Sequence, residues 1–128
     1  MGTILVIDDN EGYRANIVEV LELKAYTTLE AENGRIGLHL IHQHSPDLIL
    51  CDVDMPVMNG LEVLATVKAD PMYAKIPFLL ITGHCDEQML KTSHDLGVAA
   101  CLKKPTTVKE LLTTITHFLK EEDPTLLS

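Results

Sequence analysis

Three aspartates follow two short, mostly apolar runs, at points where each run would end as a β-strand. Asp8 and Asp9 follow the run 3–7, and Asp52 follows the run 47–51. If these runs are neighbours in a parallel sheet, their carboxyl ends meet at one edge and the acids crowd together. At about 5 Å and an effective dielectric near 20, each ionised pair repels by about 3 kcal/mol. Either a carboxyl takes up a proton or a divalent cation binds. Mg²⁺ fits best because it takes oxygen ligands, with Mn²⁺ as a substitute.

Two further predicted strands bring a hydroxyl and an ammonium group to the same edge. Thr82 follows the run 78–81, and Lys104 follows the run 98–102 and precedes Pro105. A lysine ammonium is a point charge suited to a phosphoryl oxygen. A nucleophilic carboxylate, a metal-binding acid pair, a hydroxyl and an ammonium form a set for phosphoryl transfer. In that chemistry an aspartate attacks phosphorus and becomes an acyl phosphate.

The chain around these groups alternates β-rich runs with helical periods five times. Strands are predicted at 3–7, 27–31, 47–51, 78–81 and 98–102, and helices at about 10–23, from 33, from 59, at 86–96 and from 107. Asn33 is a predicted helix cap, and Asn59 and Thr107 each begin a predicted capping box with a glutamate three residues later. Continuous apolar strands that alternate with helices indicate a parallel sheet covered on both faces. Right-handed crossovers leave few topologies. The predicted fold is α/β, a doubly wound, flavodoxin-like five-stranded sheet in the order 2-1-3-4-5.

Composition narrows the classes of function. The 128 residues carry a net charge of −9 and no basic patch, which argues against nucleic-acid binding by this domain. No apolar run approaches the roughly 20 residues of a membrane span. An odd number of widely spaced cysteines predicts free thiols in a reducing, cytoplasmic compartment, with Cys51 and Cys101 buried. We expect one domain over residues 1–120 and a tail or linker over 121–128.

Four segments together resemble a known family. The segments VIDDN (6–10), PDLILCDVDMPVMNG (46–60), IPFLLITGH (76–84) and CLKKP (101–105) are similar, in this order and spacing, to the chemotaxis-regulator-like receiver domain of two-component response regulators. The resemblance implies a signalling switch without an external turnover substrate. It implies phosphorelay partners: a histidine kinase or a histidine phosphotransfer protein that supplies the phosphoryl group. An output domain, a target protein or a second copy of the chain would receive the signal.

The resemblance also assigns roles to residues. Asp52 would be the phospho-acceptor, and Thr82 and Lys104 would bind the phosphoryl group. Asp9 and Asp52 would bind Mg²⁺ directly. Asp8 would act largely through water, and the backbone carbonyl of Asp54 would be a further ligand. Output would pass through the face formed by the fourth helix, fifth strand and fifth helix.

Three positions are specific to this chain. Cys101 stands where receivers of this type usually carry a tyrosine or phenylalanine that moves with the threonine. Asp54 and His84 occupy the two variable places that tune the lifetime of the phosphoryl group in the family.

Two alternatives remain open at this point. The pair Asp52 and Asp54 is also typical of haloacid-dehalogenase-like phosphatases, although their motif ends the first strand, and here that strand is followed by two aspartates. A receiver-like binding module that is never phosphorylated is favoured by the missing aromatic and disfavoured by the complete set of site residues.

Overall fold

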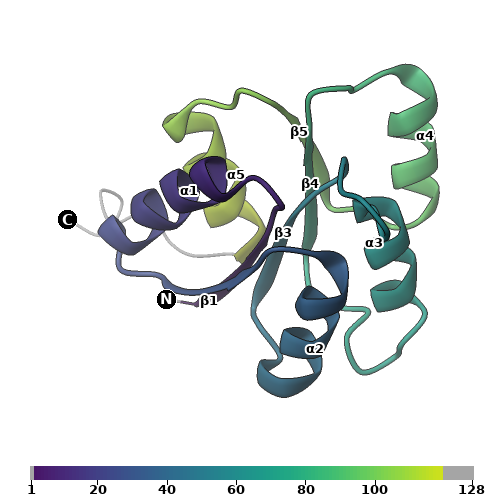
Figure 1. The fold of residues 1–128 in the computed structure, drawn as a ribbon, viewed down its shortest axis with the longest axis horizontal. Helices are drawn as coiled ribbons and strands as arrows, with labels where there is room; N and C mark the ends of the chain where they lie inside the picture. Colours follow the sequence, from purple (N-terminus) through teal and green to yellow (C-terminus); the bar gives the residue numbers. More distant parts are fainter. Residues whose placement is uncertain (1, 120–128) are drawn as a thin grey trace.

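Five short strands form one parallel sheet in the computed structural model, which describes residues 2–119 (Figure 1). The strands are β1 (Thr3–Ile7), β2 (Thr27–Ala31), β3 (Leu48–Asp52), β4 (Phe78–Thr82) and β5 (Ala100–Lys103). Their order in the sheet is β2-β1-β3-β4-β5, and every neighbouring pair is parallel. The predicted fold class and strand order are confirmed.

Helices connect the strands, and polar side chains fix where most of them begin. The helices are α1 (Glu11–Leu23), α2 (Gly34–His44), α3 (Gly60–Lys68), α4 (Glu87–Asp95) and α5 (Val108–Leu119). The side chains of Asn10, Asn33 and Asp86 each accept a hydrogen bond from an amide three residues later. The predicted capping box of Asn59 and Glu62 is present in full. In the second predicted box, the hydroxyl of Thr107 accepts from the amide of residue 110 at 3.0 Å.

Side-chain alternation along the strands gives the sheet two apolar faces. On one face, Ile4 and Val6 of β1 pack in the core with residues of α1 and α5. On the other face, Leu5 and Ile7 pack with residues of α2 and α3. Figure 1 shows α1 and α5 on one side of the sheet and α2, α3 and α4 on the other. Both faces are covered, so the edge at the carboxyl ends of the strands is where polar groups can gather.

The strand ends differ slightly from the sequence prediction. Strands β3 and β4 each run one residue further than predicted, so Asp52 and Thr82 are the last residues of their strands. Strand β5 begins at Ala100, two residues later than predicted. Gly97 adopts a left-handed φ of 89°, and the amide of Val98 donates to the carbonyl of Ser93 at 3.0 Å. That amide therefore completes the end of α4 and is not available to a strand.

The cysteine and tail predictions have mixed outcomes. Cys51 is buried as predicted, with 0% exposure. The prediction for Cys101 is wrong, because this residue is only half-buried on β5, the strand at one edge of the sheet. The predicted tail at 121–128 lies outside the described residues. Within residues 2–119, no helix combines the length and apolar character needed to cross a bilayer.

Candidate functional site

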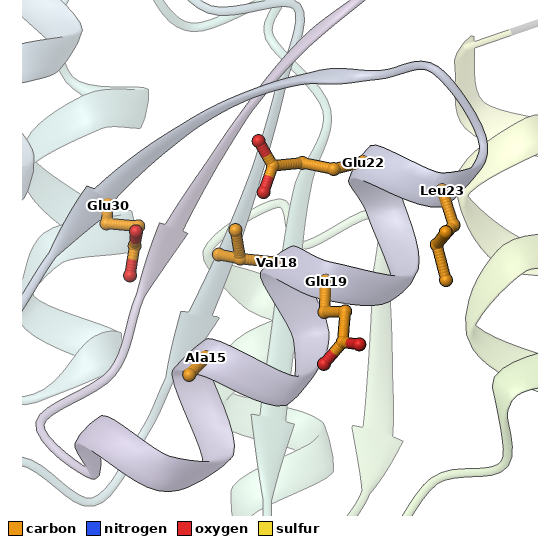
Figure 2. Close-up of a pocket in the computed structure, with 6 residues that line it drawn as sticks. All are labelled: Ala15, Val18, Glu19, Glu22, Leu23 and Glu30. Carbon is orange, nitrogen blue, oxygen red and sulfur yellow. The ribbon is translucent and has the colours of Figure 1, made fainter.

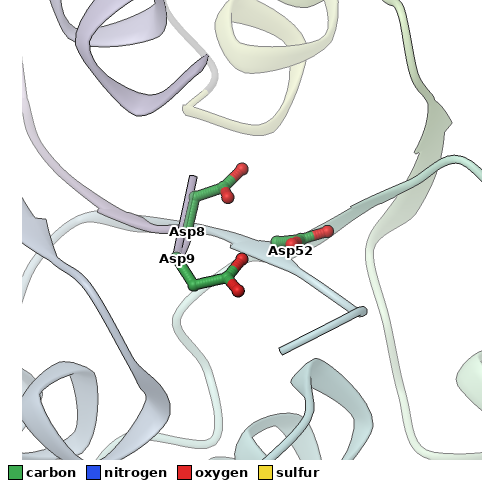
Figure 3. Close-up of side chains that lie close together, drawn as sticks. All are labelled: Asp8, Asp9 and Asp52. Carbon is green, nitrogen blue, oxygen red and sulfur yellow. The ribbon is translucent and has the colours of Figure 1, made fainter. Parts of the chain in front are cut away.

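Three carboxylates meet at the carboxyl edge of the sheet. Asp8 follows β1 directly, and the pairing of Ile7 with Cys51 places it beside Asp52 at the end of β3. Asp8, Asp9 and Asp52 each offer an oxygen, and these oxygens all lie within 4.8 Å of one another. Figure 3 shows the three carboxyl groups gathered at the strand ends. Asp8 and Asp52 are 1% and 3% exposed, whereas Asp9 is exposed to solvent. The crowding predicted from the sequence is therefore present.

One ammonium group bridges the two buried acids. The Nζ atom of Lys104 lies 3.1 Å from Oδ2 of Asp8 and 3.3 Å from Oδ1 of Asp52. The backbone holds this lysine in place, because its amide donates to the carbonyl of Thr82 at 2.8 Å. The same Nζ atom lies 4.4 Å from the centroid of the Tyr13 ring, a cation–π contact. The lysine ammonium is thus placed to bind a negatively charged group that becomes attached to Asp52.

Burial and charge together perturb this cluster. The pKa of Asp52 is raised to about 6, first by burial and then by the negative charge of Asp8, and Lys104 offsets both only in part. Burial lowers the pKa of Lys104, but its hydrogen bond to Asp8 and the charges of Asp8 and Asp52 outweigh that effect and raise it overall. Three carboxylates around one ammonium leave an excess of negative charge when all are ionised. The cluster therefore has a net negative charge that a cation could neutralise.

The donor set fits a hard divalent cation. Mg²⁺ binds oxygen at about 2.0–2.1 Å in octahedral geometry, so oxygens on opposite sides of the ion are about 4.2 Å apart. That spacing is close to the 4.8 Å within which the oxygens of Asp8, Asp9 and Asp52 lie. In the described part of the chain this is the one group of three or more acidic, histidine or cysteine side chains arranged to hold a metal. The histidines there form no such group.

The side chain of Thr82 contacts two other predicted site residues. Its side chain is fully buried, and its hydroxyl donates to Oδ2 of Asp54 at 2.9 Å. The hydroxyl oxygen of Thr82 in turn accepts from the backbone amide of His84 at 3.0 Å. The side chains of Asp54 and His84 themselves lie at exposed positions. The hydroxyl predicted to meet a phosphoryl group is thus held by a carboxylate in this structure, a contact that sequence analysis did not predict.

A glycine lets the loop after β3 close tightly beneath Asp52. The amide of Gly60 donates to the carbonyl of Val53 at 3.0 Å. A Cβ atom on Gly60 would lie 2.9 Å from Cα of Val53 and 3.0 Å from the carbonyl carbon of Asp52. Real Cβ atoms do not approach backbone that closely, so a side chain here would displace Asp52. The sequence signal is the Asn-Gly pair at 59–60, where the asparagine also caps α3.

Two residues at the site, both on the first turn of α1, were not predicted from the sequence. Tyr13 packs against the Lys104 ammonium, as described above. Arg14 donates from its guanidinium to the carbonyl of Asp8, and its Nε atom lies 3.1 Å from Oε1 of Glu30 on β2. Both residues come three or four positions after the Asn10 cap. Residues at that spacing after a helix cap lie on the first turn, close to the strand end that precedes the cap, and this was the available signal.

Cys101 lies apart from the acid cluster. Its side chain is on β5, and its Sγ atom is 3.4 Å from Sγ of Cys85 in the segment between β4 and α4. The position at which the resemblance predicted an aromatic residue is therefore occupied by one half of a thiol pair.

An open groove between α1 and β2 contains none of the predicted site residues (Figure 2). It is lined by Ala15, Val18, Glu19, Glu22, Leu23 and Glu30. Three of these side chains are acidic, and Glu30 is already paired with Arg14. The groove is separate from the acid cluster at the strand ends.

The sheet is doubly wound and parallel, and acids, a hydroxyl and an ammonium group lie at the edge where its winding reverses. This combination is typical of domains that accept a phosphoryl group on an aspartate. The sequence profile of the response regulator receiver domain matches residues 4–116. The chain belongs to this family, whose members act as phosphoaspartate switches in two-component signalling. Receiver domains interact with histidine kinases or phosphotransfer proteins.

Similar proteins agree with this assignment. The polar-differentiation response regulator DivK of Brucella anthropi is 31% identical over 120 residues, covering 91% of this chain and 95% of DivK. Sporulation initiation phosphotransferase F of Bacillus subtilis is 30% identical over 116 residues, covering 91% of this chain and 92% of the relative. The structure of the Vibrio cholerae chemotaxis protein CheY4 matches with a TM-score of 0.88 and 28% identity, over 92% of this chain and 98% of CheY4. The phosphatase alternative gains no support from these comparisons.

Proposed function

We propose that Asp52 accepts a phosphoryl group from the phosphohistidine of a histidine kinase or of a histidine phosphotransfer protein. The observation that carries the proposal is the setting of this carboxylate. Its oxygen lies 3.3 Å from the Lys104 ammonium, and the oxygens of Asp8 and Asp9 lie within 4.8 Å. A nucleophile so placed has a positive group to face the phosphoryl oxygens and a site for a metal ion beside it.

The transfer follows from these positions. An oxygen of Asp52 attacks phosphorus, the bond from phosphorus to the donor imidazole nitrogen breaks, and the imidazole leaves. Lys104 then faces the phosphoryl oxygens and offsets their charge, and the Thr82 hydroxyl donates to one of them. Asp9 and Asp52 would hold Mg²⁺ directly, with Asp8 acting through water and the carbonyl of Asp54 as a further ligand; Mn²⁺ would substitute. The metal ion supplies positive charge that stabilises the transferring group.

Two contacts must change before the phosphoryl group is fully bound. Lys104 divides its ammonium between Asp8 and Asp52 in this structure, and Thr82 donates to Asp54. The phosphoryl group competes for both donors. Release of Thr82 from Asp54 would carry the signal to the face formed by α4, β5 and α5, where Cys101 replaces the usual aromatic. Asp54 and His84 flank the site and would set the lifetime of the acyl phosphate.

The wider assignment follows from this switch mechanism. The chain would turn over no external metabolite, and p-nitrophenyl phosphate would not be hydrolysed through repeated cycles. Residues 1–120 would form the receiver and residues 121–128 a tail or linker. Three free cysteines support a reducing, cytoplasmic location. The signal would be received by an output domain, a target protein or a second copy of the chain, and neither nucleic acid nor membrane would be bound by this domain.

The proposal is tested with beryllofluoride, which mimics a phosphoryl group bonded to a carboxylate. Bound ¹⁹F resonances should appear with the wild-type chain only when Mg²⁺ is present, and they should be absent in Asp52→Asn. The matched control is Asp95→Asn, which removes an exposed acid at the end of α4 and should bind as the wild type does. Binding by Asp52→Asn would show that Asp52 is not the acceptor, and equal binding with and without Mg²⁺ would remove the metal ion from the proposal. Failure of the wild-type chain to bind with Mg²⁺ present would support a receiver-like binding module in place of a switch.

A further inference from the structure

Two cysteines from different parts of the chain lie side by side near the carboxyl end of β4. Cys85 lies between β4 and α4, three residues after Thr82, and Cys101 lies on β5. Their sulfur atoms are 3.4 Å apart, within hydrogen-bonding distance, and both residues are half-buried. The third cysteine, Cys51, is fully buried, and its thiol donates to the carbonyl of Asp52 at 3.3 Å. The chain therefore has one thiol pair that solvent can reach and one isolated thiol that it cannot.

We propose that Cys85 and Cys101 form a reversible redox site that reacts with hydrogen peroxide to give an intrachain disulfide. A disulfide bond is about 2.05 Å long, so the two sulfurs must approach by about 1.4 Å. Cys85 lies in an irregular segment outside the helices and strands, so this approach needs no break in the sheet.

The two thiols have different roles in the reaction. The pKa of Cys101 is raised to about 12, first by burial and then by the neighbouring Cys85 sulfur. Cys101 therefore stays protonated, and attack on the oxidant is assigned to Cys85. The Cys85 thiolate attacks one peroxide oxygen, the O–O bond breaks, and a sulfenic acid forms while hydroxide leaves. The Cys101 sulfur then attacks the sulfenyl sulfur, its S–O bond breaks, and hydroxide leaves and is neutralised by the Cys101 proton. The dithiol loses two electrons, and the peroxide is reduced to water.

The disulfide would tie the segment after β4 to β5. The amide of His84, next to Cys85, donates to the Thr82 hydroxyl at 3.0 Å. A tether there would hold Thr82 in its present position, donating to Asp54. This consequence rests on the proposed function: the oxidised chain should bind beryllofluoride more weakly than the reduced chain.

The site is tested by counting thiols on the reduced wild-type chain before and after treatment with a few equivalents of hydrogen peroxide. Alkylation under denaturing conditions should find three free thiols before treatment and one after it, and dithiothreitol should restore three. Peptide mapping should place the disulfide between residues 85 and 101. The Cys51→Ala variant should still lose two thiols, whereas Cys85→Ser and Cys101→Ser should form no intrachain disulfide.

Three results would overturn the proposal. They are retention of all three thiols, a disulfide that includes Cys51 or links two chains, and oxidation of one cysteine beyond sulfenic acid with no disulfide. All three results are measured on the wild-type chain. They therefore stand even if a cysteine variant fails to fold. Beryllofluoride binding is compared between the reduced and oxidised wild type. Failure of the reduced chain to bind counts against the proposed function alone, and equal binding by both forms counts against the tether.

Discussion

Replacing Asp52 with asparagine is expected to stabilise the fold when no divalent cation is present. Asparagine has nearly the shape of a protonated aspartic acid, so the variant resembles the chain with Asp52 neutral. In the wild type at pH 7, this buried carboxylate is ionised beside Asp8. Burial and that neighbouring charge both disfavour ionisation, and Lys104 offsets them only in part.

The size of the effect follows from the pKa of Asp52. Its ordinary value is 3.8, and the folded chain raises it to about 6. At 1.36 kcal/mol per pKa unit, ionisation of Asp52 costs the folded state about 3 kcal/mol. The folded chain binds this proton more tightly than the unfolded chain. The wild type should therefore lose stability as pH rises from about 4 to about 6, and the full cost should be present at pH 7.

Urea denaturation between pH 4 and 7.5, with EDTA and then with Mg²⁺, measures this prediction. Asp52→Asn should exceed the wild type in free energy of unfolding by about 3 kcal/mol at pH 7, and by little near pH 4. The control Asp95→Asn should differ from the wild type by no more than about 0.5 kcal/mol, because this acid is exposed. Mg²⁺ at ten times its dissociation constant should add about 1.4 kcal/mol to the wild type and less to Asp52→Asn. Equal stability of Asp52→Asn and wild type across this pH range would refute the reasoning.

Three further substitutions test individual contacts. Gly60→Ala should lower the free energy of unfolding in urea by about 1–3 kcal/mol because its Cβ meets backbone, and Gly83→Ala, where nothing lies within 4 Å of an added Cβ, should cost much less. Asp54→Ala should lower the dissociation constant for beryllofluoride about tenfold by freeing the threonine hydroxyl that ends β4; an unchanged constant would mean that this hydrogen bond does not oppose binding. Lys104→Met should raise the pKa of Asp52 above about 6, as followed by carboxyl ¹³C shifts, because the ammonium lowers this pKa more than the amide of Asp54 does; a fall in that pKa would contradict the electrostatic reasoning.

The sheet and the meeting of its acids could be predicted because both follow from short-range patterns. Apolar strands alternating with capped helices allow few topologies, and the order 2-1-3-4-5 places the end of the first strand beside the end of the third. Asp8, Asp9 and Asp52 are attached directly to those strand ends. Their separation is therefore set by the backbone, with little dependence on loop conformation or on side-chain rotamers.

The contacts that were not predicted depend on loops and long side chains. The side chain of Asp54 accepts a hydrogen bond from Thr82, and whether it is oriented towards Thr82 depends on the path of the loop after β3. Cys85 meets Cys101 because the segment after β4 folds back towards β5. Arg14 reaches its partners through a long side chain, and the helical period does not fix the orientation of that side chain. Sequence spacing identifies such residues as candidates but does not determine their partners.

The most direct test of the central claim is to identify the residue that carries the phosphoryl group. The chain is treated with acetyl phosphate and Mg²⁺, the acyl phosphate is reduced with borohydride, and the product is mapped by peptide mass spectrometry. Reduction converts a phosphorylated aspartate to homoserine. We predict homoserine at position 52 only when Mg²⁺ is present. In the Lys104→Met variant, the yield of homoserine at position 52 should be much lower or zero. Homoserine at position 8, 9 or 54, or the same yield without divalent cations, would contradict the central claim.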